Sequence, residues 1–171
     1  MKPLSFIIIT YNRCADTLEL LQNIHSLHKA NELLEDIIVV NNASTENYTE
    51  VKEYINNNTQ LPFKYYDAPS NLGVTKGRNF ALQYAQGSIC IFLDDDAILQ
   101  NNDALEKVIQ SFEDKGFNNR EVAIVSFKVL YYENLEMQVN ALPHKNFEYY
   151  KSLPKLVNYL KSFFMVWKNM I

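Results

Sequence analysis

Apolar residues in this chain fall into short runs, and segments with helical spacing separate the runs. The first runs are rich in β-branched residues, which is typical of strands buried on both faces of a sheet. Strands are expected at residues 4–10, 36–40, 62–67, 88–93 and 121–131. Helices are expected at residues 15–28, 46–57, 71–86 and 102–115. The alternation predicts an α/β fold with a mostly parallel central sheet and helices on both faces.

The alternating pattern weakens after Tyr132, so we divide the chain into a core at residues 1–132 and a second region at 133–171. Residues 153–170 are predicted to form an amphipathic helix. Lysines lie beside its apolar side, which carries Leu156, Leu160, Phe163, Phe164, Trp167 and Met170. Packing on the domain or on a partner subunit is the favoured interpretation, and the alternatives are a membrane surface and a homodimer contact.

Composition and charge narrow the class of protein. The chain has 171 residues, of which 47% are hydrophobic and 13% aromatic, so it is not a disordered chain. Its formal net charge of -4 argues against a nucleic-acid binder, which usually carries a basic surface. Two cysteines, Cys14 and Cys90, do not make a disulfide framework, and no apolar stretch is long enough to span a membrane. We therefore predict a cytoplasmic protein.

Glycine is scarce and concentrated in one place. Average usage of about 7% would give roughly three times the four that are present, which are Gly73, Gly77, Gly87 and Gly116. Gly87 is predicted to end the helix at 71–86, and Gly116 the helix at 102–115. Gly73 and Gly77 lie where the first of these helices begins, and exposed N–H groups at a helix start attract anions. The loop matches no phosphate-binding fingerprint, so an ordinary turn stays the alternative.

Three consecutive acids, Asp94, Asp95 and Asp96, follow the apolar run at 88–93. Carboxylates this close repel one another, and a divalent cation relieves the repulsion. All-oxygen ligands suit Mg²⁺ or Mn²⁺. In an extended chain Asp94 and Asp96 point the same way, so both could face a common metal site. The alternative is a solvated acidic turn.

The other strand ends place polar and aromatic groups at the same edge of the predicted sheet. Residues 10–13 (TYNR) and 41–44 (NNAS) end the first two strands. Ligands of open α/β sheets bind beyond the carboxyl ends of the strands, so this edge is the predicted site. Tyr11 could stack on a base and Asn41 could hydrogen-bond its edge, which together with a metal and an anion-binding loop indicates a ligand with phosphate groups.

Four segments together resemble the nucleotide-sugar-binding half of glycosyltransferase family 2, which has the GT-A fold, a Rossmann-like nucleotide-diphospho-sugar transferase fold. They are FIIITYNR, IIVVNNAST, NLGVTKGRNFAL and AQGSICIFLDDDAIL, in the family's order and spacing over residues 4 to about 130. The resemblance implies a metal-dependent enzyme that transfers a sugar, with inversion, from a nucleoside diphosphate sugar to an acceptor hydroxyl. The expected acceptor is a glycan or lipid-linked glycan in surface polysaccharide synthesis, with the enzyme at the inner face of the membrane or free in the cytoplasm.

The resemblance also implies roles for individual residues. Asp94 and Asp96 match the DXD motif and would be the ligands of Mn²⁺ or Mg²⁺, while Asp94 or Asp95 would contact the ribose. The implied nucleotide-sugar-binding set is Thr10, Tyr11, Arg13, Asn41, Gly73, Arg78, Asp94 and Asp95.

Two departures from the family pattern matter. Asn41 stands where the family usually has an Asp that accepts a base N–H. An amide can accept through its oxygen but also donates, so the resemblance does not extend to the base preference. Residues after Tyr132 show no acidic pair of the kind that supplies the family's general base, so the catalytic residue stays unknown. Two alternatives therefore remain, a truncated nucleotide-sugar-binding module without activity and a haloacid dehalogenase-like phosphatase.

Overall fold

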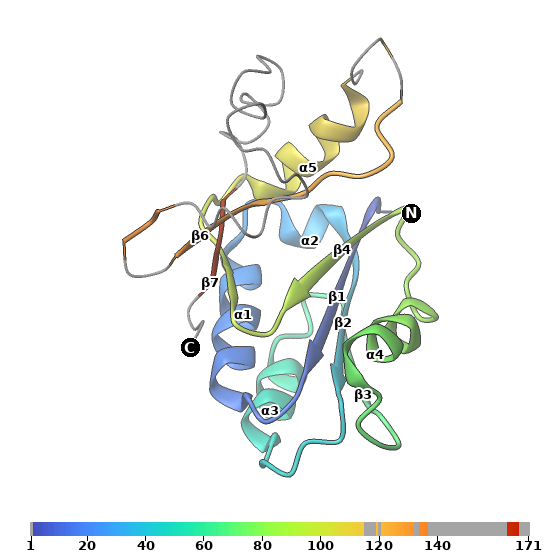
Figure 1. Cartoon of the computed structure of the whole chain (residues 1–171), viewed down its shortest axis with the longest axis vertical. Helices are drawn as coiled ribbons and strands as arrows, with labels where there is room; N and C mark the ends of the chain where they lie inside the picture. The colour runs from blue at the N-terminus through green and yellow to red at the C-terminus, as the bar shows by residue number, and fades with distance from the viewer. Residues whose placement is uncertain (1, 115–118, 120, 132–133, 137–163, 168–171) are drawn as a thin grey trace. The chain divides into compact units, whose positions relative to one another are not determined.

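The computed structural model of the chain describes residues 2–114, 119, 121–131, 134–136 and 164–167 (Figure 1). Two compact units divide at Ala97, so residues 1–97 and 98–171 are taken in turn. In chain order the elements are β1 (Leu4–Thr10), α1 (Cys14–Ser26), α2 (Ala30–Leu33), β2 (Leu34–Asn41), α3 (Thr49–Asn57), β3 (Phe63–Asp67), α4 (Gly73–Leu82), β4 (Ile89–Asp94), β5 (Ala97–Leu99), α5 (Ala104–Glu113), β6 (Lys128–Tyr131) and β7 (Phe164–Trp167).

The first unit contains a four-stranded sheet in the order β3-β2-β1-β4. All three strand pairs are parallel, as the alternation of strands and helices predicts. Thr10 pairs with Asn41, Asn41 pairs with Asp67, and Ile9 pairs with Asp94. This register brings the carboxyl ends of all four strands to one edge, where ligands of open α/β sheets bind.

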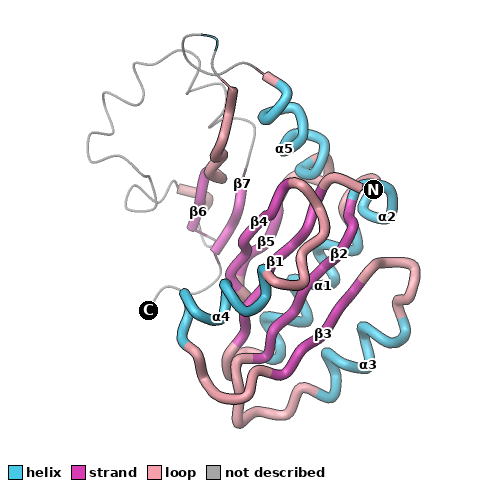
Figure 2. The backbone as a smooth tube through the Cα atoms, turned by 90° about the vertical axis from the view of Figure 1, so that its right-hand side faces the viewer, coloured by secondary structure: helices cyan, strands magenta, loops and turns pink. Residues whose placement is uncertain are grey.

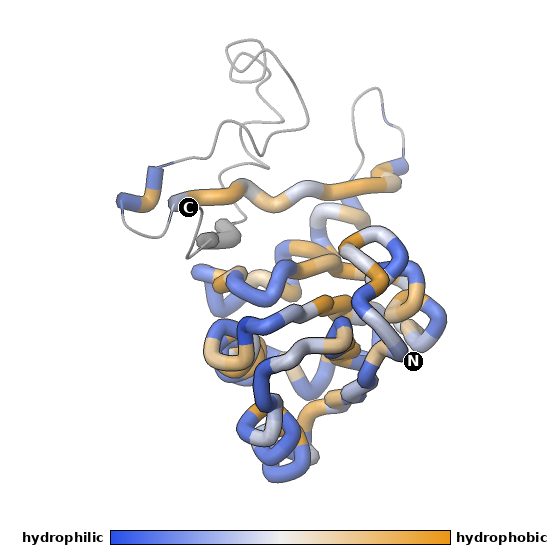
Figure 3. The backbone as a smooth tube through the Cα atoms, turned by 60° about the horizontal axis from the view of Figure 1, so that its bottom comes forward, coloured by the Kyte–Doolittle hydropathy of each residue, from blue (hydrophilic) through white to orange (hydrophobic). Residues whose placement is uncertain are grey.

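Helices cover both faces of this sheet, with α1 and α3 on one side and α4 on the other (Figures 1 and 2). Ile7, Ile38 and Val40 form the core under α4, where they pack with Ala81. Neighbouring strand residues point to opposite faces, so Phe6 faces the side of α1 and α3 and is also fully buried. Hydrophobic and hydrophilic stretches alternate along the backbone in Figure 3, as expected for a sheet between two helical layers.

Gly87 does not end α4, which corrects the sequence prediction. The helix ends at Leu82 rather than Gln86, and among the described glycines positive φ is found at Gly73. A Cβ on Gly87 would lie 2.7 Å from the carbonyl carbon of Leu4 and 2.7 Å from Ser5 Oγ. Glycine is needed here because the segment before β4 runs directly against the start of β1.

The second unit contains α5 and the sheet β5-β7-β6, in which β6 and β7 are parallel. The strand expected at 121–131 is confirmed only at Lys128–Tyr131. Residues 121–127 lie outside regular structure, and Ile124 is 87% exposed. Apolar alternation alone therefore did not determine the length of this strand. Gly116 lies outside the described residues.

The helix predicted at 153–170 is wrong at Phe164–Trp167, which form β7. The sequence FMVW combines aromatic and β-branched residues, which favour strands, and here it pairs with β6. The rest of that predicted helix lies outside the described residues, and the membrane-surface and homodimer interpretations stay predictions. In the described parts of the chain, no helix is both long and apolar enough to cross a bilayer.

Candidate functional site

The end of β1 is fixed by a buried hydroxyl network. Thr10 Oγ1 lies 2.5 Å from the hydroxyl of Tyr48 and accepts a hydrogen bond of 2.7 Å from Thr17 Oγ1. The Tyr48 hydroxyl also accepts from the backbone N–H of Arg13 at 3.0 Å. Thr10 and Tyr48 are 1% and 3% exposed. Thr10 thus acts mainly through the position it gives to the loop between β1 and α1.

Replacing Tyr48 with phenylalanine tests this network. We expect the change to lower the free energy of unfolding by about 1–2 kcal/mol, because Thr10 and the Arg13 N–H lose a buried partner. Urea unfolding measures it. The control is Tyr65→Phe. The hydroxyl of Tyr65 donates to Asp67 at an exposed position, so its removal should lower the free energy of unfolding less. Equal losses for the two variants would contradict the role given to Tyr48.

Asn12 joins the ends of β1 and β2. Its backbone is left-handed, with φ of 53°, and its N–H donates to Ser44 Oγ at 2.9 Å. Its side-chain Oδ1 accepts from the backbone N–H groups of Thr45 at 2.8 Å and Glu46 at 3.2 Å. Asparagine tolerates left-handed backbone and bonds nearby main chain, so it suits this turn. Sequence reasoning assigned Asn12 no role, although it stands in the TYNR segment.

Asn41 is held by its neighbours in the sheet. Its amide nitrogen donates to Asp67 Oδ1 and its oxygen accepts from Ser44 N, both at 3.0 Å. The residue is 8% exposed, whereas the Asp67 side chain is 56% exposed. Burial raises the pKa of Asp67, but hydrogen bonds from Lys52 and Asn41 outweigh burial and lower it overall. Asp67 therefore presents a stable negative charge at the end of β3, a feature that sequence reasoning missed.

The glycine loop is attached to the end of β2 by Asn42. The amide of Asn42 donates to Asn71 Oδ1 at 3.0 Å, and its oxygen accepts from Leu72 N at 2.8 Å. Asn71 Oδ1 also accepts from the N–H of Gly73, whose φ is +70°. Asn42 is 3% exposed. Its role in shaping the start of α4 becomes visible only when the structure brings Asn42 and Asn71 together.

The three aspartates have different surroundings. Asp94 is the last residue of β4. Its Oδ1 accepts a hydrogen bond of 2.6 Å from Nη2 of Arg78, a residue of α4. Asp95 and Asp96 form a turn before β5 instead of continuing the strand. The extended conformation that would point Asp94 and Asp96 the same way is therefore not present. Among the residues that the structure describes, no three acidic, histidine or cysteine side chains are grouped as a metal site.

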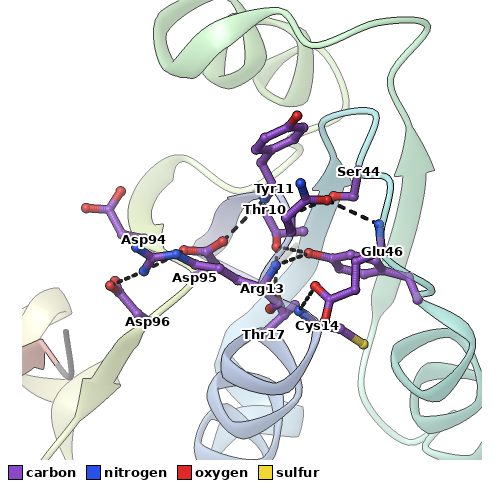
Figure 4. A network of polar contacts seen from close by, with 12 residues as sticks. Thr10, Tyr11, Arg13, Cys14, Thr17, Ser44, Glu46, Asp94, Asp95 and Asp96 are labelled. Carbon is purple, nitrogen blue, oxygen red and sulfur yellow. Dashed lines mark hydrogen bonds and ion pairs between the residues drawn. The ribbon is translucent and has the colours of Figure 1, made fainter.

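Asp95 and Asp96 face the loop after β1 (Figure 4). Asp95 Oδ2 accepts from the backbone N–H of Tyr11 at 3.4 Å, and Arg13 Nη1 donates to Asp96 Oδ2. Burial raises the pKa of Asp95 to about 6, even though Thr10 and Arg13 stabilise its charged form. Burial lowers the pKa of Arg13, but the hydrogen bond and charge of Asp96 outweigh it, so the guanidinium remains charged. The ring of Tyr11 is 44% exposed beside this pair.

Comparison with known proteins agrees with this arrangement. The profile described as "Glycosyl transferase family 2" matches residues 5–171. The chain belongs to glycosyl transferase family 2. Membership in this family sets the phosphatase alternative aside. The resemblance read from the four segments is confirmed.

Two of the three curated relatives described next are named as sugar transferases. An uncharacterised protein of Haemophilus influenzae is 30% identical over 143 residues, which cover 84% of this chain and 75% of that protein. The abequosyltransferase RfbV of Salmonella typhimurium is 35% identical over 60% of this chain and 31% of its own length. The O-antigen chain rhamnosyltransferase WbaN of Salmonella anatum is 29% identical over 67% of this chain and 35% of its own.

Solved structures confirm the GT-A fold. TarS 1-349 of S. aureus, in complex with UDP-GlcNAc, superposes with a TM-score of 0.59 at 27% identity, covering 75% of this chain and 38% of that TarS chain. The mannosyltransferase PcManGT of Pyrobaculum calidifontis, in complex with GDP-Man and Mn²⁺, gives a TM-score of 0.60 at 23% identity, a likeness of fold alone. This chain therefore spans about a third of the sugar-transferring relatives described here.

The family assignment and the structure together sort the predicted residues. Most of the predicted residues lie together at the carboxyl edge of the sheet. These are Thr10, Tyr11, Arg13, Asn41, Asp94, Asp95 and Asp96. Arg78 joins them through Asp94, and Gly73 through the contacts of Asn71. Proximity is thus observed for this set.

Proposed function

We propose that this edge binds a nucleoside diphosphate sugar as the donor half of an inverting glycosyltransferase. One observation carries the proposal: the loops after β1 and β4, far apart in sequence, are joined by Arg13 to Asp96 and by Tyr11 to Asp95. Such a junction at the carboxyl edge is where open α/β sheets bind ligands. In the same proposal, Tyr11 stacks on the base, and Asn41 lies at the base edge.

The phosphates of the donor would lie between the β4 turn and the start of α4. Arg78 and Arg13 supply positive charge there, and the N-terminus of α4 begins at Gly73, which leaves open space for an approaching ligand. Asp94 or Asp95 would hold the ribose. The positions of the two arginines and the charge that a diphosphate carries support the phosphate placement, and the resemblance to the family supports the ribose contact.

The donor set at this turn fits a hard divalent cation. Mg²⁺ commonly takes one or two carboxylates and completes its coordination with water and substrate phosphates. In this proposal Asp96 is the first ligand of Mg²⁺ or Mn²⁺, and Asp94 becomes a second ligand when its carboxylate leaves Arg78 and turns toward Asp96. When bound, the ion would neutralise charge on the departing diphosphate. Arg78 would then position the phosphates from α4, and the buried network around Thr10 would keep the loop after β1 in place.

The acceptor is proposed to be a glycan or lipid-linked glycan in surface polysaccharide synthesis. Support comes from relatives named as an abequosyltransferase and an O-antigen chain rhamnosyltransferase. The residue that removes the acceptor proton is not assigned. A chain lacking that residue would bind donor and turn it over slowly, because a placed base contributes about 10²–10⁴-fold.

Ligand-dependent stability tests the proposal. Thermal unfolding is recorded with UDP, GDP, ADP, CDP and dTDP, each with and without Mn²⁺. We expect one diphosphate with Mn²⁺ to stabilise the protein, by about 2.7 kcal/mol at a hundred times its dissociation constant. No stabilisation by any of them would contradict donor binding. Incubation with the matching nucleotide sugar then separates the two remaining functions, because turnover indicates an enzyme and its absence a binding module.

A further inference from the structure

The guanidinium of Arg13 occupies one oxygen of Asp96, the carboxylate that the proposed function gives to the metal ion. Arg13 Nη1 donates to Asp96 Oδ2 and lies 3.8 Å from Asp95 Oδ1 (Figure 4). The side chains of these two aspartates are only 6% and 12% exposed. Two adjacent, nearly buried carboxylates need a positive charge nearby. In this structure Arg13 supplies it.

The backbone of Arg13 is fixed, whereas the end of its side chain can move. Its N–H donates to the Tyr48 hydroxyl at 3.0 Å, and its carbonyl accepts from Thr17 N at 3.0 Å and Thr17 Oγ1 at 2.7 Å. By contrast, 41% of the side chain is exposed to solvent. A change of side-chain rotamer could therefore carry the guanidinium away from Asp96 without disturbing β1 or α1.

A guanidinium bonded to Asp96 Oδ2 and a divalent cation on the same carboxylate repel each other, because two positive charges then lie only a few ångströms apart. Arginine keeps its charge at any ordinary pH, so it cannot yield by losing a proton. An ion that binds Asp96 therefore favours a rotamer that carries the guanidinium of Arg13 away from this carboxylate. The displaced guanidinium remains close to the ion, because the backbone of Arg13 stays fixed. Guanidinium groups bind phosphate through paired hydrogen bonds.

We propose that Arg13 is a positioning residue that competes with the metal ion for Asp96 and binds the donor diphosphate once the ion has displaced it. This inference rests on the proposed function. It implies that the metal alone binds weakly, since Arg13 must first lose its carboxylate partners. The diphosphate offers Arg13 a new partner, so metal and nucleotide strengthen each other's binding.

Binding of Mn²⁺ alone tests the competition. Free Mn²⁺ is measured by its electron paramagnetic resonance signal during titration of wild-type protein, Arg13→Gln and Arg13→Lys. We expect Arg13→Gln to bind Mn²⁺ roughly tenfold more tightly than wild type, because the competing charge is gone. Arg13→Lys keeps the charge but not the planar guanidinium, so its affinity for Mn²⁺ is expected to lie between those of wild type and Arg13→Gln. Lys52→Gln, which removes a cation paired with Asp67 instead, leaves the affinity unchanged and controls for net charge.

Nucleotide binding at saturating Mn²⁺ tests whether the displaced Arg13 binds the diphosphate. We expect Arg13→Gln to bind the diphosphate that stabilises wild type about tenfold more weakly, by calorimetric titration. Mn²⁺ binding by Arg13→Gln no tighter than wild type, in protein with an unchanged unfolding transition, would overturn this inference and leave the proposed function intact. Failure of wild type to bind any diphosphate with Mn²⁺ would instead overturn the proposed function, and this inference with it.

Discussion

Replacing Asp96 with asparagine is expected to abolish the stabilisation that Mn²⁺ and a nucleoside diphosphate give together. Asparagine keeps the size of the side chain but removes its charge, and a neutral amide is a poor ligand for Mg²⁺ or Mn²⁺. About 2.7 kcal/mol of stabilisation at a hundred times the dissociation constant should fall to nearly zero. Thermal unfolding with and without both ligands measures the loss.

The matched control for this variant is Asp103→Asn. Asp103 is an aspartate at the start of α5 that forms a 2.9 Å ion pair with Lys107. The same chemical change there should leave ligand-dependent stabilisation at the wild-type level. If Asp96→Asn kept the full effect of Mn²⁺ and nucleotide, Asp96 would not be a ligand, and the metal would have to be placed elsewhere.

Replacing Gly87 with alanine is expected to cause the largest loss of stability in the first unit. The new methyl group would lie 2.7 Å from the Leu4 carbonyl carbon and 2.8 Å from Ser5 N, both backbone atoms that cannot turn aside. The N–H of Gly87 also donates to Ser5 Oγ at 2.8 Å, so movement of the segment would cost that bond. We expect a loss of about 3 kcal/mol in the free energy of unfolding, measured with urea.

Gly73→Ala is the appropriate comparison. Nothing lies within 4 Å of a Cβ at Gly73, so the substitution meets only the strain of a φ of +70°. That strain costs about 1 kcal/mol. A smaller loss at Gly87 than at Gly73 would show that the backbone before β4 can move away from β1, which would contradict the close contact described above.

The central sheet could be predicted from sequence because its strands are short apolar runs. The strand expected at 36–40 is Leu34–Asn41 in the structure, and that at 88–93 is Ile89–Asp94. Burial on both faces requires apolar side chains at successive positions, so such strands are visible in sequence. Their carboxyl ends then point to the site, which is why the four segments converge where expected.

Contacts between distant residues could not be predicted in the same way. The pairing of Arg13 with Asp96 depends on the turn at Asp95, which an apolar pattern does not reveal. Asn42 and Asn71 lie in polar loops that look alike in sequence, although their hydrogen bond fixes the glycine loop. Gly87 was given a helix-ending role because it follows a helical pattern, whereas its neighbour in space is Leu4.

The hydrogen bonds of Asn12 have a consequence for the thermodynamics and rate of recognition. They hold the backbone of Thr45 and Glu46 against the loop after β1 through contacts within the protein itself. A ligand that meets loops already held in place loses less conformational entropy on binding than one that must order them. Binding then needs little rearrangement of the main chain, which favours fast association. Differences in affinity between ligands will arise chiefly from their dissociation rates.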